Sequence, residues 1–74
     1  MNWEKTGRTV LGNGESTVSY RSGRYTIETR KRLHPHSGRE GYWMYTSYFL
    51  IVDGHETEYH SLRDAKEAAE RMDA

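Results

Sequence analysis

Residues 42–52 form a long run of aromatic and β-branched side chains that ends at the dipeptide Asp53-Gly54. Such a pair between two strand-like runs is a strong hairpin signal, because a type I′ turn needs a positive φ at both central residues. The residues after the turn alternate again in the manner of a returning strand. We therefore predict a β-hairpin with strands at residues 41–52 and 55–60.

A helix is predicted directly after this hairpin. Ser61 is a preferred N-cap residue, and Asp64 stands at the capping-box position three residues later. Small and apolar residues then recur at helical spacing and form one stripe: Leu62, Ala65, Ala68, Ala69 and Met72. We predict a helix over residues 62–72, whose alanines allow close approach to a sheet.

Two more strands are predicted earlier in the chain, at residues 16–21 and 24–32, where apolar and polar residues alternate. Residues 33–41 hold the only proline and are predicted to form a loop. Residues 1–15 are rich in glycine and weakly patterned, so we predict a weakly structured N-terminal segment there. Residues 16–74 then form one domain.

This order of elements predicts an α+β fold, a three- or four-stranded antiparallel β-meander with one C-terminal α-helix packed on one face. A chain of 74 residues, 34% of them hydrophobic, supports only a small core. Dimerisation would be an inexpensive way to bury more apolar surface. The aromatic rings must supply much of the buried area, because each ring is large.

The two-residue turn also predicts the register of the hairpin. It pairs Val52 with His55, and counting outward pairs Leu50 with Thr57 and Tyr48 with Tyr59. We assign the face that carries these apolar side chains to the helix, and it comprises Tyr42, Met44, Tyr48, Leu50, Val52 and Tyr59. We call the opposite side of the sheet the distal face, and its expected members are Trp43, Tyr45, Ser47, Phe49, Ile51, Glu56, Glu58 and His60.

Alternation places the charged side of residues 24–32 on the distal face as well: Arg24, Glu28, Arg30 and Arg32. A single helix covers only one face of a sheet, so the apolar side chains of the distal face need another explanation. The N-terminal segment could fold over this face and make it core. Alternatively, the face binds a protein, or its rings and arginines bind nucleic acid.

The net charge of zero conceals two oppositely charged blocks. Residues 21–39 contain six basic residues against one acid, whereas residues 40–74 contain eight acids against three basic residues. A basic block is typical of a protein that meets a polyanion or an acidic partner. The alternative is that the two blocks attract each other across the sheet.

The sequence offers little that is typical of catalysis or of a bound cofactor. There is no cysteine, phosphate-binding loop or nucleophile elbow. His34-Pro35-His36 resembles half of a metal site, but a polar loop explains it as well. No apolar run approaches the length needed to span a bilayer, and the N-terminus lacks the apolar middle of a signal peptide. We expect a cytoplasmic protein that is not an enzyme and has no metal, cofactor or membrane association.

The aromatic strand, the Asp-Gly turn, the Ser61-Leu62 cap and the Ala-Lys-x-Ala-Ala helix together resemble small proteins of tailed phages. The resemblance covers about residues 24–70. The architecture is also similar to the arm-binding domains of phage integrases and to AP2-type DNA-binding domains. In those domains the strands enter the major groove, which would imply that Arg24, Arg30 and Arg32 contact DNA.

Together these observations predict a small binding module, in the manner of a phage accessory protein acting inside a bacterial cell. The expected binding surface is Trp43, Tyr45, Phe49, Arg24, Arg30 and Arg32. The first expectation is a protein partner, including a second copy as a homodimer. The alternative is a DNA- or RNA-binding domain that uses the basic region at residues 21–39.

Overall fold

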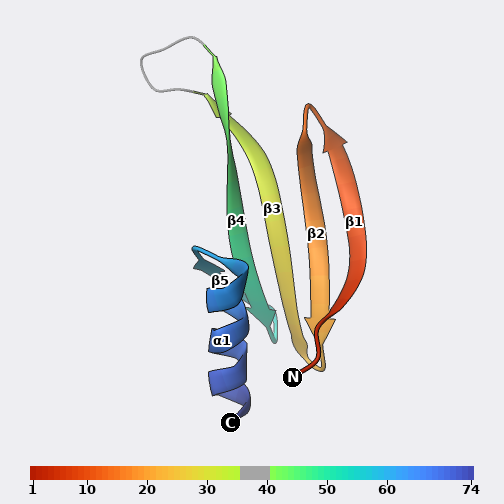
Figure 1. The fold of residues 1–74 in the computed structure, drawn as a ribbon, viewed down its shortest axis with the longest axis vertical. Coiled ribbons are helices and arrows are strands. Elements are labelled where there is room, and N and C mark those ends of the chain that lie inside the picture. The colour runs from red at the N-terminus through yellow and green to blue at the C-terminus, as the bar shows by residue number, and fades with distance from the viewer. Residues whose placement is uncertain (36–40) are drawn as a thin grey trace.

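The computed structural model describes residues 1–35 and 41–74 and contains a five-stranded antiparallel sheet followed by one helix (Figure 1). Neighbouring strands in the sequence are neighbours in the sheet, so the topology is a β-meander. This confirms the α+β fold class, with more strands than predicted. The elements are β1 (Glu4–Gly12), β2 (Glu15–Ser22), β3 (Tyr25–Pro35), β4 (Tyr42–Val52), β5 (His55–Tyr59) and α1 (Leu62–Asp73).

The hairpin β4–β5 has the predicted turn and register. Asp53 and Gly54 have φ angles of 51° and 82°, as the central residues of a type I′ turn require. Val52 pairs with His55, and the pairs of Leu50 with Thr57 and of Tyr48 with Tyr59 follow from it, as predicted.

The N-terminal segment differs from its prediction. Residues 1–15 were predicted to be weakly structured, yet Glu4–Gly12 form an edge strand that pairs with β2. Register shifts between Lys5 and Gly7 and between Val10 and Gly12 interrupt this ladder. The whole strand is exposed, so it lacks the alternating apolar pattern by which a half-buried strand is recognised.

The prediction of a loop at residues 33–41 is wrong for residues 33–35, which belong to β3, and residues 36–40 lie outside the described part of the chain. Leu33 pairs with Met44 on β4. It has no partner on β2, because the β2–β3 ladder reaches only as far as the pair of Ser16 and Lys31. Its backbone N–H instead donates a 3.0 Å hydrogen bond to the carboxylate of Glu15. A side chain therefore replaces the missing backbone partner and lets the strand extend.

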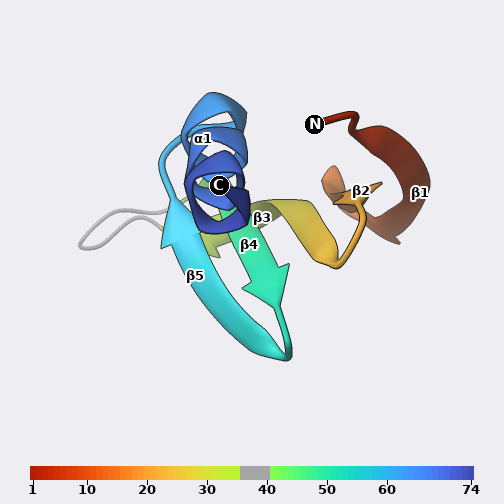
Figure 2. The same cartoon turned by 90° about the horizontal axis from the view of Figure 1, so that it is seen from below.

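The core lies between α1 and the strands β3, β4 and β5, where the helix lies on one face of the sheet (Figure 2). Ile27 and Leu50 are 0% and 1% exposed, and the buried alanines of the helix face them. The predicted cap is present, since the Asp64 N–H donates to Ser61 Oγ at 3.1 Å. Trp3 packs against this core rather than against the distal face.

The helix covers only part of the sheet. A helix of 12 residues is about 18 Å long, whereas the molecule extends over 46 Å. The far end of the β3–β4 hairpin and the strands β1 and β2 reach beyond the helix (Figure 1). Tyr42 and Met44, which were assigned to the helix-covered face, are therefore exposed. The large exposed hydrophobic residues on these strands are Val10, Leu11, Tyr42, Trp43 and Met44.

Candidate partner-binding face

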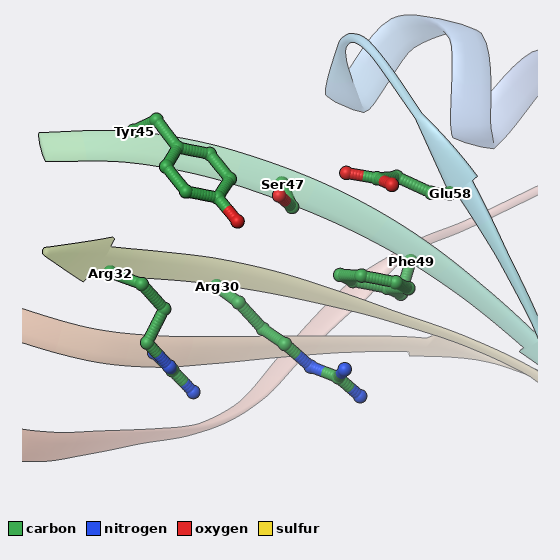
Figure 3. Close-up of a pocket in the computed structure, with 6 residues that line it drawn as sticks. All are labelled: Arg30, Arg32, Tyr45, Ser47, Phe49 and Glu58. Carbon is green, nitrogen blue, oxygen red and sulfur yellow. The ribbon is translucent and has the colours of Figure 1, made fainter. Parts of the chain in front are cut away.

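Strands β3, β4 and β5 place charged and aromatic side chains around a shallow hollow on the distal face. The register sets Arg32 opposite Tyr45 and Arg30 opposite Ser47. It also sets Phe49 between Glu28 and Glu58. The hollow has a volume of about 360 Å³ (Figure 3), and its lining consists of Arg30, Arg32, Tyr45, Ser47, Phe49 and Glu58.

Arg30 is held in place on the distal face by an aromatic ring and two carboxylates. Its guanidinium lies 4.2 Å from the ring centroid of Phe49, in cation–π geometry. It donates hydrogen bonds to Glu28, at 2.9 Å from Nε, and to Glu56 on β5. Burial alone would lower the pKa of Arg30, but the hydrogen bonds and charges of Glu28 and Glu56 raise it above its ordinary value. The charge of Arg30 is therefore balanced inside the fold.

Arg32 turns toward β2 and away from the aromatic rings (Figure 3). It donates at 2.7 Å to both the backbone oxygen of Ser16 and the hydroxyl of Thr17. A third bond, 3.0 Å long, reaches the backbone oxygen of Lys31. These acceptors are neutral, so Arg32 ties β3 to β2 while it keeps its net positive charge.

The aromatic residues form a cluster at the end of the sheet far from the helix. The ring centroids of Trp43 and Tyr45 are 5.2 Å apart, and His34 lies 4.0 Å from Tyr45. Trp43 is 45% exposed, and Tyr45 and Phe49 are half-buried. His34 was predicted to be part of a possible metal pair. Extending the alternation of residues 24–32 by two positions would have placed it on the distal face.

Arg24 does not join the other predicted binding residues. Its guanidinium donates at 3.3 Å to Asp53, in the β4–β5 turn, and to the hydroxyl of Tyr25. The Tyr25 hydroxyl in turn donates to Asp73 at the end of α1, at 3.4 Å. The hydrogen bond to Tyr25 and the charge of Asp53 raise the pKa of Arg24. This residue therefore belongs to a polar cluster at the opposite end of the molecule from Trp43.

Of the explanations for the distal face, the structure does not support a cover made by the N-terminal segment. Strand β1 extends the sheet sideways beyond β2, and Trp3 lies on the helix side. The attraction between charge blocks is seen directly, since Arg24 contacts Asp53 and Arg30 contacts Glu56. Part of the basic block is therefore neutralised by the acidic block within one molecule.

Metal binding finds no support in the part of the chain that the structure describes. Residues 1–35 and 41–74 contain no group of three or more His, Cys, Asp or Glu residues that could hold a metal ion. His36, the second half of the suspected metal pair, lies outside the described residues. Within those same ranges, no helix has both the length and the apolar character needed to cross a membrane.

Known proteins give no further guide to the site. Comparison of the chain with protein families, with curated proteins and with solved structures finds no match. The resemblances to phage proteins and to DNA-binding domains of similar architecture therefore stay predictions.

Proposed function

We propose that this protein is a non-enzymatic binding module that engages a protein partner through the distal face. The observation that carries the proposal is the state of Arg30, which is stacked on Phe49 and bonded to two carboxylates. Because the charge of Arg30 is balanced within the fold, the distal face offers a partner mainly aromatic side chains beside the hollow and few unpaired positive charges. Aromatic residues and arginine are the side chains that most often anchor protein interfaces.

The nucleic-acid alternative has weaker support. Phosphate binding requires basic side chains that are free to neutralise phosphates and so release the counterions of the nucleic acid, but Arg24 and Arg30 are each paired with acids. Glu58 lines the same hollow and would repel a phosphate group. Of the three arginines in the predicted binding surface, Arg32 alone bonds to neutral acceptors, so the geometry favours a protein surface over a phosphate backbone.

The proposal is tested with immobilised protein in extracts of the source cells, at two salt concentrations. The wild-type chain is compared with Phe49→Ala, which opens the hollow, and with Glu70→Gln on the exposed side of α1 as a control. We expect a partner that is retained by the wild type and the control and lost with Phe49→Ala. Retention should persist at high salt, because an aromatic interface depends little on counterions.

A parallel titration uses fluorescein-labelled single-stranded DNA, double-stranded DNA and RNA at about 50 mM and about 200 mM salt. We expect no tight binding of any of the three. Tight binding that weakens steeply with salt, and that is lost in the double variant Arg30→Ala/Arg32→Ala, would overturn the proposal in favour of nucleic acid.

A further inference from the structure

Strand β4 is paired along its length on one edge but only partly on the other. Strand β3 pairs with residues 42–51, whereas β5 pairs only with residues 48–52. After Tyr59 the chain turns into α1, so no described strand lies beside residues 42–46 on that side (Figure 1). We call residues 42–46 of β4 the open edge.

The turn geometry shows which backbone groups point out of the open edge. In a two-residue type I′ hairpin the flanking residues form a hydrogen-bonded pair, and such pairs alternate along an antiparallel ladder. Val52 is such a residue, so the even-numbered residues of β4 direct N–H and C=O toward the β5 side. The backbone N–H and C=O groups of Tyr42, Met44 and Thr46 therefore point out of the open edge. Among the described residues, no turn or loop backbone hydrogen bond reaches them.

A contact on the other side of the hairpin agrees with this assignment. Leu33 is the register partner of Met44, and its N–H bonds to Glu15 on the β2 side. Leu33 therefore points its backbone groups away from β4. In an antiparallel ladder its partner does the same, so the N–H and C=O of Met44 point away from β3.

The open edge lacks the features that protect the other sheet edges. Strand β1 has two register shifts along its ladder, and β5 is five residues long with Glu56 and Glu58 on it. Irregularities, short length and charges all discourage edge-to-edge pairing. The open edge has the sequence Tyr-Trp-Met-Tyr-Thr, with no charge, no proline and no register shift. Tyr42 and Met44 on it are 69% and 37% exposed.

We propose that the open edge pairs with the open edge of a second copy of this chain, antiparallel and with Met44 opposite Met44 of the second copy. This inference goes beyond the proposed function, because it concerns a second copy of this chain and an edge of the sheet rather than the distal face. A two-fold axis perpendicular to the sheet relates the copies, so the same patch serves both sides of the interface. The result is one continuous sheet through two β4 strands.

This register is the one that satisfies the outward groups best. It sets Tyr42 opposite Thr46 of the second copy. Each residue whose N–H and C=O point out of the open edge then faces another such residue, and about six backbone hydrogen bonds form. A shift of the second copy by two residues would bring Tyr42 opposite Tyr48, whose edge is already paired with Tyr59. Only the register centred on Met44 uses the whole open edge.

Side chains and charge also favour a second copy. In this register Trp43 meets Tyr45 of the second copy on the distal face, in a non-hydrogen-bonded pair where side chains are closest. Aromatic pairs of this kind add stability beyond the area they bury. The open edge carries no charge, so two copies meet without like-charge repulsion. Strand β5 and α1 lie toward the other end of β4, away from the open edge (Figure 1).

Molar mass across a concentration series, measured by light scattering or sedimentation, tests the proposal. We expect the wild type to rise from 8.7 kDa toward twice that mass. Met44→Lys and Met44→Glu should each stay monomeric, because like charges then face each other at the two-fold axis. An equimolar mixture of the two variants should regain the dimer mass, because opposite charges then meet there.

Val10→Lys is the matched control, since Val10 is 67% exposed but lies on β1. It should dimerise like the wild type. Hydrogen exchange of the wild type gives a second readout that needs no variant: the amides of Met44 and Thr46 should exchange more slowly as the dimer forms. A wild type that stays monomeric, a dimeric Met44→Lys variant, or a monomeric mixture would each overturn the proposal.

Failure of this inference can be told apart from failure of the proposed function. Phe49 lies outside the open edge, so Phe49→Ala should abolish partner capture and leave dimerisation intact. A wild type that captures a partner through Phe49 while remaining monomeric would reject only the dimer. A dimer that captures nothing would reject only the wider binding function.

Discussion

The two ends of strand β4 have similar side chains and very different surroundings. Residues 48–51 are paired on both edges and covered by α1 on one face. Residues 42–46 are paired on one edge and lie beyond the helix. Leu50 is 1% exposed whereas Met44, on the same face, is 37% exposed. Apolar composition made both ends strand, but the length of the helix and the end of β5 decided which end became core.

The largest expected effect comes from truncating one apolar side chain in each end of β4. Leu50→Ala should lower the free energy of unfolding by about 2–5 kcal/mol, because a buried leucine is lost and a cavity remains. Met44→Ala, the matched change beyond the helix, should cost less than about 1 kcal/mol, because the side chain is already exposed. Urea denaturation followed by circular dichroism measures both values. Equal losses would show that the two ends are not energetically different.

A smaller effect is expected at the start of the helix that creates this difference. Ser61→Ala should cost about 1 kcal/mol, because the Asp64 N–H loses the acceptor that caps α1. Ser61→Asp is the control and should keep most of the stability, since an aspartate can accept the same hydrogen bond. Thermal denaturation compares the three proteins. A Ser61→Asp protein as unstable as Ser61→Ala would contradict the role of the cap.

The smallest expected effect concerns Trp43 in the helix-free end. Trp43→Ala should change the free energy of unfolding by less than about 1 kcal/mol, because the indole is nearly half exposed at the end of the sheet. Its fluorescence should be accessible to a soluble quencher in the monomer, with Trp3→Phe as the background that removes the second tryptophan. Loss of folding in Trp43→Ala would instead make the aromatic cluster part of the core.

Most of the fold was predictable, because the signals that specify it are local. The Asp53-Gly54 turn sets the register of β4 and β5, and Ser61 sets the start of α1. Strand β1 was missed because it is exposed throughout and its register is interrupted. Its sequence therefore lacks the alternation of apolar and polar residues that identifies a half-buried strand. The end of β3 was missed because Pro35 is typical of a loop, whereas a strand can end on proline.

The candidate site was predictable in position but not in detail. Alternation placed Tyr45, Phe49 and Arg30 on one face, and the hollow brings them together. The same alternation placed Arg24 there, yet this long side chain at the β2–β3 turn reaches Asp53 instead. A period of two specifies the side of a strand from which a side chain leaves, but it does not specify where a flexible arginine ends.

Short-range chemistry in the chain accounts for the meander, the hairpin register and the cap, because turns and periods act over a few residues. Glu28 is a near neighbour of Arg30 on β3, but tertiary contacts alone decided that Arg30 also meets Glu56, since that pairing depends on strands β3 and β5 lying on either side of β4. They also created the open edge. The open edge exists because β5 is shorter than β4 and because the chain continues from β5 into α1, which leaves residues 42–46 of β4 without a neighbouring strand among the described residues.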